Sequence, residues 1–264
     1  MNTATYGVRD SATMLRRNLK HMARYPSQTL MLIGLPLLFL LLFVYVFGGT
    51  MGAGLPGAPA GDRSDYLAFI TPGVLVIAVA SVSISTAVSV ASDMTGGIID
   101  RFRTMAIAKV SVLTGHVLCA MVQTALALAT VFGVAFLLGL ETAAPAMQWL
   151  GLIGLLALLS FAMTWFTVAL GLASPNPEAA SNWPMIFIML PFVGSGFVPV
   201  ESMPTGLRWF AEYQPFTPVI DAFRSLLAGS PDGSDVLRAI GWCVVIGLIG
   251  YLWSRRLYRT RAAN

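Results

Sequence analysis

The sequence predicts an all-α integral membrane protein with six transmembrane helices. Of the 264 residues, 56% are hydrophobic and 11% are charged, and the mean hydropathy is +0.76. A soluble domain carries about 25% charged residues, so this chain is too apolar to fold as one. Apolar runs of roughly 20 residues, each long enough to cross about 30 Å of hydrocarbon as a helix, recur along the chain. They lie near residues 28–48, 67–91, 113–139, 147–173, 183–199 and 239–254.

The arm that precedes the first run, residues 9–24, predicts a helix at the membrane interface. Its apolar residues gather near one side of a helix: Met14, Leu15, Leu19 and Met22. Basic residues surround the remainder: Arg16, Arg17, Lys20 and Arg24. This pattern is typical of a helix that lies in the plane of the interface. The run that follows is too long for the apolar part of a signal peptide, so we expect a retained span.

The distribution of lysine and arginine predicts the orientation. With six spans, twelve of the 16 basic residues fall on one side, in the arm, in the segment 97–109 and in the tail after residue 254. Basic residues accumulate on the cytoplasmic side. We therefore expect both termini to be cytoplasmic, in a multi-pass protein of the cytoplasmic (inner) membrane. This bias also explains the net charge of +4 without any binding of nucleic acid.

Two spans carry further features. The second contains a stripe of serines, which fits either close helix packing or a wall that faces a substrate: Ser81, Ser85, Ser89 and Ser92. The fifth is short and contains three prolines: Pro184, Pro191 and Pro199. The region after it, residues 200–234, is too apolar for a solvated loop and too interrupted for a span. We expect short interfacial or re-entrant helices there, anchored by aromatic residues at headgroup depth.

The chain lacks the motifs of an energy-coupling or catalytic centre. Apart from His116, the six runs contain no ionisable Asp, Glu, Lys, Arg or His, whereas proton- and ion-coupled carriers commonly keep such groups in the membrane. There is no GxxxxGK[ST] loop for ATP, and no metal or catalytic motif. Cys119 and Cys243 lie within apolar runs and fit a packing role. We therefore predict no enzyme activity, metal or cofactor in this chain, and expect any transport to draw its energy from another one.

A charged segment, GGIIDRFRTMAIAK at residues 96–109, separates the second and third runs. Written as a helix, it gathers one apolar face: Ile98, Ile99, Phe102, Met105 and Ala106. Asp100, Arg101 and Arg103 project around the opposite side, and Asp100 and Arg103 are spaced to pair. Such a helix, held between two spans, can transmit a movement of a soluble energy-supplying protein to both spans. An ordinary cytoplasmic loop, whose arginines only fix the topology, fits the same spacing.

Three stretches resemble the permeases of ABC type-2 exporters, specifically those of the daunorubicin-resistance type. GGIIDRFRTM is similar to the family's coupling segment, and YLAFITPGVL resembles the start of its second span. FVPVESMPTGLRWFAEYQPFTPVIDAFRSLL is similar to its external region, where the motif positions are Pro215, Thr217, Pro218, Asp221 and Arg224. The likeness covers nearly the whole chain and implies a single ABC type-2 transmembrane domain over residues 1–264. One departure is Met105-Ala106, where members often have Leu-Pro.

The resemblance implies a half-transporter. Two permeases, identical or paralogous, pair in the membrane lipid, and each docks a separate nucleotide-binding ATPase subunit that uses ATP and Mg. The arm at 9–24 would lie beside that subunit. The coupling helix would comprise Gly97, Ile98, Ile99, Asp100, Arg101, Phe102, Arg103 and Thr104.

The resemblance also implies that spans one, two and five border the substrate path. Candidate lining residues there are Phe39, Phe43, Ser85, Ser89, Phe187 and Phe192. Each phenylalanine also fits a packing or lipid-facing role. The primary hypothesis is an exporter subunit that moves a hydrophobic or amphipathic drug, polyketide or lipid outward. The alternatives are a membrane scaffold that binds a soluble partner without transport, and a secondary carrier that uses backbone sites.

Overall fold

The computed structural model describes residues 3–52, 63–96 and 109–261, and every regular element in those ranges is a helix. Five helices there are long and apolar enough to cross a membrane. They span Pro26–Gly52, Arg63–Thr95, Val112–Leu137, Ala146–Ala173 and Gly233–Thr260. Five of the six predicted apolar runs fall on them. The chain is therefore an all-helical, multi-pass membrane protein.

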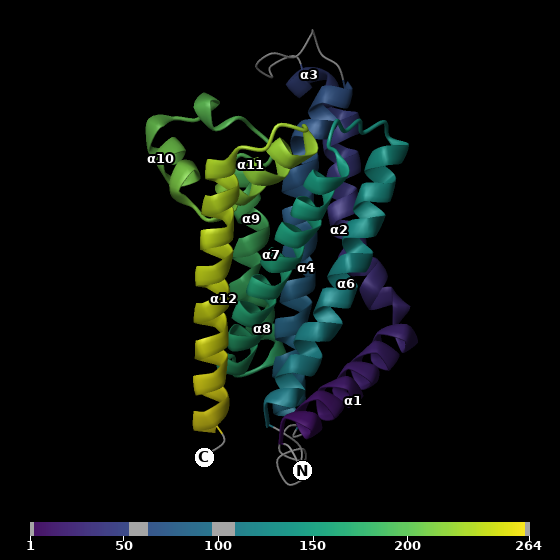
Figure 1. Ribbon diagram of the computed structural model, residues 1–264, viewed down its shortest axis with the longest axis vertical. Helices are drawn as coiled ribbons and strands as arrows, with labels where there is room; N and C mark the ends of the chain where they lie inside the picture. The colour runs from purple at the N-terminus through teal and green to yellow at the C-terminus, as the bar shows by residue number, and fades with distance from the viewer. Residues whose placement is uncertain (1–2, 53–62, 97–108, 262–264) are drawn as a thin grey trace.

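The long helices form one elongated bundle (Figure 1). They are α4 (Arg63–Thr95), α6 (Lys109–Leu137), α7 (Ala146–Ala173), α12 (Gly233–Arg261) and a first helix made of α2 (Pro26–Leu42), the π-helical turn η1 (Phe43–Phe47) and α3 (Gly48–Gly52). The start of α1 (Thr3–Arg24) and the end of α12 lie at the same end of the bundle, which we call the terminal end. The opposite end is the distal end.

Helix α4 is the centre of the bundle. It packs against α2, α6 and α7 and against three shorter helices, and most of its residues from Tyr66 to Ser83 are buried. The shorter helices are α8 (Pro177–Asn182), α9 (Ile186–Val193) and α11 (Phe216–Leu227). A helix covered on all sides must be apolar on all sides, which accounts for its sequence. Glycines allow close packing of α7 on α4 and of α12 on α7. A Cβ on Gly171 of α7 would lie 2.5 Å from the Ala87 carbonyl oxygen, and one on Gly250 of α12 would lie 2.4 Å from the Phe166 nitrogen.

The predicted fifth span at 183–199 is not one long helix. The chain there forms α8 (Pro177–Asn182), the 3₁₀ turn η2 (Trp183–Met185) and α9 (Ile186–Val193), then leaves the helix before η3 (Val200–Ser202). Proline recurs every seven residues, at 177, 184 and 191, and each proline lacks the N–H that a continuous helix needs. Pro177 opens α8, Pro184 lies in the 3₁₀ turn and Pro191 lies inside α9, so only Pro184 coincides with a change of helix type.

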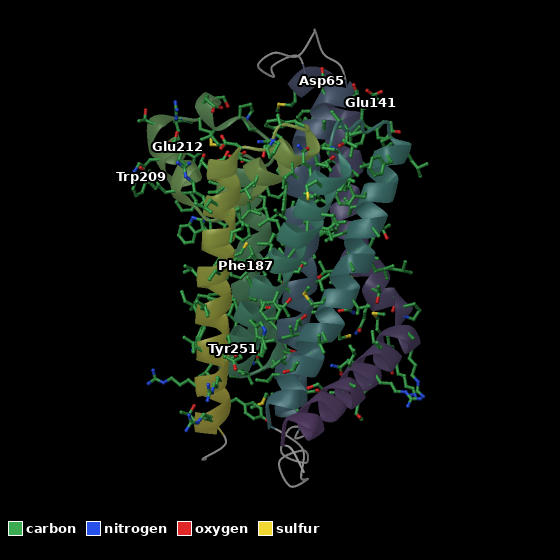
Figure 2. All side chains as sticks on the ribbon, in the orientation of Figure 1. Asp65, Glu141, Phe187, Trp209, Glu212 and Tyr251 are labelled. Atoms are coloured by element: carbon green, nitrogen blue, oxygen red, sulfur yellow. The ribbon has the colours of Figure 1, made fainter. Side chains whose placement is uncertain are left out.

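Two short helices follow in the region 200–234, as predicted. Helix α11 (Phe216–Leu227) is inserted into the bundle, and nine of its 12 residues are buried. Helix α10 (Thr205–Tyr213) lies outside α12 at the distal end (Figure 1), where the Trp209 side chain is 65% exposed and projects away from the bundle (Figure 2).

Candidate functional site

The predicted coupling segment, Gly97 to Thr104, lies outside the described residues. Its flanking helices are described: α4 ends at Thr95 and α6 begins at Lys109, both at the terminal end. The segment therefore connects these two helices. Within the described ranges, no group of three His, Cys, Asp or Glu side chains is placed to hold a metal ion.

Helix α1 packs against the terminal half of α6. Met14 is buried in this contact, and Gly115 makes room for it, since a Cβ there would lie 2.5 Å from the Met14 Cβ. Of the four basic residues predicted on this helix, three are exposed: Arg16, Lys20 and Arg24. The fourth, Arg17, turns toward the bundle and is only partly exposed. The helix thus presents one basic surface and one packed surface.

Three helices meet at a charged cluster that we call the terminal joint: Arg17 of α1, Asp93 of α4 and His116 of α6. The two terminal nitrogens of Arg17 donate to the two carboxylate oxygens of Asp93 at 3.2 Å each. His116 Nε2 lies 3.1 Å from Asp93 Oδ2. Because the Asp93 side chain is only 13% exposed, this bidentate pair is better shielded than a surface ion pair. Within this cluster, Asp93 lies four residues before Gly97, the first residue of the predicted coupling segment.

At the distal end, four of the five motif residues lie in α11, and the fifth, Pro215, directly precedes it. Pro215 and Pro218 flank its first turn, and Asp221 accepts a hydrogen bond from Arg224 Nη1 at 2.7 Å. Both side chains keep part of their surface exposed, and burial of the remainder is the largest influence on the pair. It raises the pKa of the Asp221 carboxyl and lowers the pKa of the Arg224 guanidinium.

Arg224 also contacts two other segments. Its Nη2 donates to the backbone carbonyl of Phe69 in α4 at 3.2 Å and to the carbonyl of Ser195, just beyond α9. The guanidinium carbon lies 4.1 Å from the centre of the Phe69 ring, in a cation–π geometry. One side chain therefore joins α11, α4 and the end of α9.

The motif residue Thr217 accepts a hydrogen bond from a neighbour that sequence reasoning missed. Gln214 is buried, and its Nε2 donates to Thr217 Oγ1 at 3.2 Å and to the carbonyl of Leu190 in α9 at 3.0 Å. That carbonyl lies in the last turn of α9, where the helix offers no partner. A lone glutamine among aromatic residues was the available signal.

The residues predicted to line the substrate path are only partly brought together. Phe39 and Phe43 of the first helix meet Phe192 of α9 at ring-centre distances of 5.1 and 6.1 Å. Phe197, which sequence reasoning missed, stacks on Phe192 at 4.4 Å. Phe43 opens the π-helical turn η1, a feature frequent at functional sites. These four rings form the aromatic cluster.

The other predicted path residues, Phe187, Ser85 and Ser89, are not part of this cluster. Phe187, which is half-buried, packs against Phe166 at a ring-centre distance of 5.8 Å and against Phe216 at 6.2 Å. Along the serine stripe of α4, burial falls toward the terminal end: Ser81 is buried, Ser85 is half-buried and Ser89 is exposed.

The family model described as "ABC-2 type transporter" matches residues 10–228, which include most of α1, the segment 97–104 and all of α11. The chain belongs to the ABC-2 type transporter family. It is 31% identical over 255 residues, 96% of this chain and 87% of the relative, to the daunorubicin resistance ABC transporter permease protein DrrB1 of Streptomyces coeruleorubidus. It is 24% identical over 252 residues, 90% of this chain and 87% of the relative, to the probable doxorubicin resistance ABC transporter permease protein DrrC of Mycobacterium tuberculosis.

Proposed function

We propose that this chain is the membrane permease subunit of an ATP-driven exporter that moves a hydrophobic or amphipathic drug outward. The observation that carries the proposal is the match over 96% of the chain to a daunorubicin resistance permease. ATP and Mg would be bound and hydrolysed by a separate nucleotide-binding subunit, and a second permease chain would complete the transporter. The whole of residues 1–264 serves as one transmembrane domain.

We place the terminal end on the cytoplasmic side of the inner membrane and count α8, η2 and α9 as a sixth, broken crossing. Two observations support this arrangement. The start of α1 and the end of α12 lie at one end, which requires an even number of crossings (Figure 1). Exposed basic residues also gather at that end, as the positive-inside rule demands: Arg16, Lys20, Arg255, Arg256 and Arg259.

The ATP-binding subunit would dock on the segment 97–104 and on the basic surface of α1. The support is mechanical. The segment connects α4 to α6, and the terminal joint ties both helices to α1 through Asp93. A movement imposed on this segment therefore reaches three helices together.

The drug would pass along the aromatic cluster between the first helix and α9. Phe39, Phe43 and Phe192 are all half-buried, so each ring keeps some surface for a ligand. Aromatic rings bind planar aromatic compounds by offset stacking or edge contacts. Daunorubicin and doxorubicin, which appear in the relatives' names, are therefore the first compounds to test as ligands of this cluster.

Co-purification tests the proposal. The tagged chain, extracted from membranes of its native host, should bring down an ATP-binding polypeptide in equal amount. Replacing Arg101 and Phe102 with alanine should reduce that recovery at least about tenfold, the effect of losing about 1.4 kcal/mol of contact. The matched control is Arg259→Ala, an exposed arginine at the same end, which should leave recovery unchanged.

Equal recovery by the double variant and its parent would show that the docking assignment is wrong. Recovery of no ATP-binding protein under any condition would favour the scaffold or secondary-carrier alternatives.

A further inference from the structure

At the distal end, α4 and the turn after α9 touch through their backbones. A Cβ on Gly73 of α4 would lie 2.8 Å from the Gly196 carbonyl oxygen and 2.9 Å from the Gly196 Cα. A Cβ on Gly196 would in turn lie 2.6 Å from the Pro191 carbonyl oxygen. We call the contact between Gly73 and Gly196 the distal seam. Glycine is needed on both sides because any side chain would separate the two segments.

Helix α11 holds the two segments of the seam from one side. Arg224 bonds the Phe69 carbonyl, four residues before Gly73, and the Ser195 carbonyl, next to Gly196. Gln214, which precedes α11, bonds the Leu190 carbonyl in the last turn of α9. These three bonds all run from polar side chains at α11 to carbonyls that flank the seam.

We propose that Arg224 and Gln214 are positioning residues that latch the distal seam shut, and that the seam opens when these bonds break during drug release. The inference rests on the proposed function. Because Gly196 directly precedes Phe197 of the aromatic cluster, the seam would be a gate at the distal end of the proposed drug path, controlled by α11.

The chemistry of the bonds fits a contact that can be released. The charge of Arg224 is paired with Asp221 on the same helix, so the ion pair moves with α11 when the carbonyl bonds break. Both side chains are partly exposed, at 27% and 31%, and water can replace the lost bonds. Release therefore leaves no charge unpaired in the protein.

The latch is also incompletely satisfied in this conformation. The Nε atom of Arg224 and the Oε1 atom of Gln214 are buried without a hydrogen-bond partner among the described residues.

Thiol labelling from the distal side tests the latch. Ser195 is buried beside the seam, and its bond to Arg224 uses the backbone carbonyl, so Ser195→Cys leaves that bond in place. The background would carry Cys119→Ala and Cys243→Ala. A membrane-impermeant maleimide should react slowly at this position in the full transporter complex. Ser202→Cys, at an exposed position nearby, is the control and should react quickly in every variant.

Arg224→Ala removes both carbonyl bonds of this side chain. It should raise the labelling rate of Ser195→Cys at least about tenfold, the population change expected from losing one hydrogen bond to a charged group. Gln214→Leu is a milder change and should raise the labelling rate severalfold. It provides the test of the latch if the Arg224→Ala variant fails to insert into the membrane. ATP turnover should raise it in the unaltered latch. The proposal is overturned if the position labels equally fast in the parent and in the variants that insert, or if ATP turnover leaves labelling unchanged in a complex that transports doxorubicin.

A different outcome separates this inference from the function on which it rests. Labelling that depends on Arg224 in a complex that moves no doxorubicin would support the latch and count against the proposed exporter.

Discussion

The two ends of the bundle use the same pair of residue types in opposite ways. At the terminal joint, Arg17 reaches from α1 to Asp93 of α4, so the ion pair connects different helices. At the distal end, Arg224 pairs within α11 and reaches α4 only through the neutral carbonyl of Phe69. Separating the helices leaves charges unpaired at the first end and loses only neutral acceptors at the second.

This difference indicates a fixed end and a movable one. At the terminal end, we expect α1, α4 and α6 to move as one body if the proposed ATP-binding subunit pushes on the segment between α4 and α6. At the distal end, α11 can separate from α4 at a lower cost. A transporter driven from one side needs both properties, because a push must first be transmitted and then open a path.

The largest expected effect breaks the terminal joint. Asp93→Asn removes the charge that pairs with Arg17 and His116, and His116 is buried. We expect a loss of about 3 kcal/mol in the free energy of unfolding, as for other shielded charge pairs that lose one partner. Unfolding in mixed micelles measures it. A loss no greater than that of Arg224→Lys would remove the distinction between the two ends.

A second variant breaks the same joint through packing. Gly115→Ala puts a methyl group against Met14, and overpacking of this kind costs about 1 to 3 kcal/mol. Gly133→Ala on the same helix is the matched control, since a Cβ there meets nothing within 4 Å. Equal stability of the two variants in the same unfolding assay would mean that α1 does not pack on α6 at this point.

Arg224→Lys sharpens the distal side of the comparison. Lysine keeps the charge next to Asp221 but lacks the fork that bonds two carbonyls, so we expect a loss of about 1 kcal/mol. Arg238→Lys is the matched control, because Arg238 also faces an aspartate three residues earlier yet is 70% exposed. The prediction is contradicted if both lysine variants unfold like the parent.

The smallest effect concerns α10. Arg208 and Glu212 form an exposed ion pair one turn apart at 2.7 Å. Exposed pairs contribute little because water screens them. Glu212→Gln should therefore unfold at the same denaturant concentration as the parent, and a clear shift would mean that α10 is covered in the assembled protein.

The long helices could be predicted because 20 consecutive apolar residues leave few alternatives to a membrane span. The broken run at 183–199 could not be predicted with its true helix lengths. The helix type changes at Pro184 but not at Pro191, which lies inside α9, and the sequence does not distinguish these two prolines. The short helices after it were predicted from their interrupted apolar pattern, although only the structure shows that α11 is buried and α10 is not.

In the candidate site, too, some residues could be predicted from the sequence and others could not. The motif gave Asp221 and Arg224 as residues of interest, while their partners at Phe69 and Ser195 are backbone atoms, which leave no mark in the sequence. Asp93 was missed because it lies just past an apolar run, where charged residues are ordinary. Its position opposite His116 follows from the antiparallel packing of α4 and α6.

ATP-dependent movement of doxorubicin into sealed vesicles tests the central claim most directly. Vesicles should contain either this chain with its ATP-binding partner or this chain alone, with the fluorescence of doxorubicin as the readout. We expect accumulation against a gradient only with both chains and ATP. Accumulation by this chain alone would contradict it.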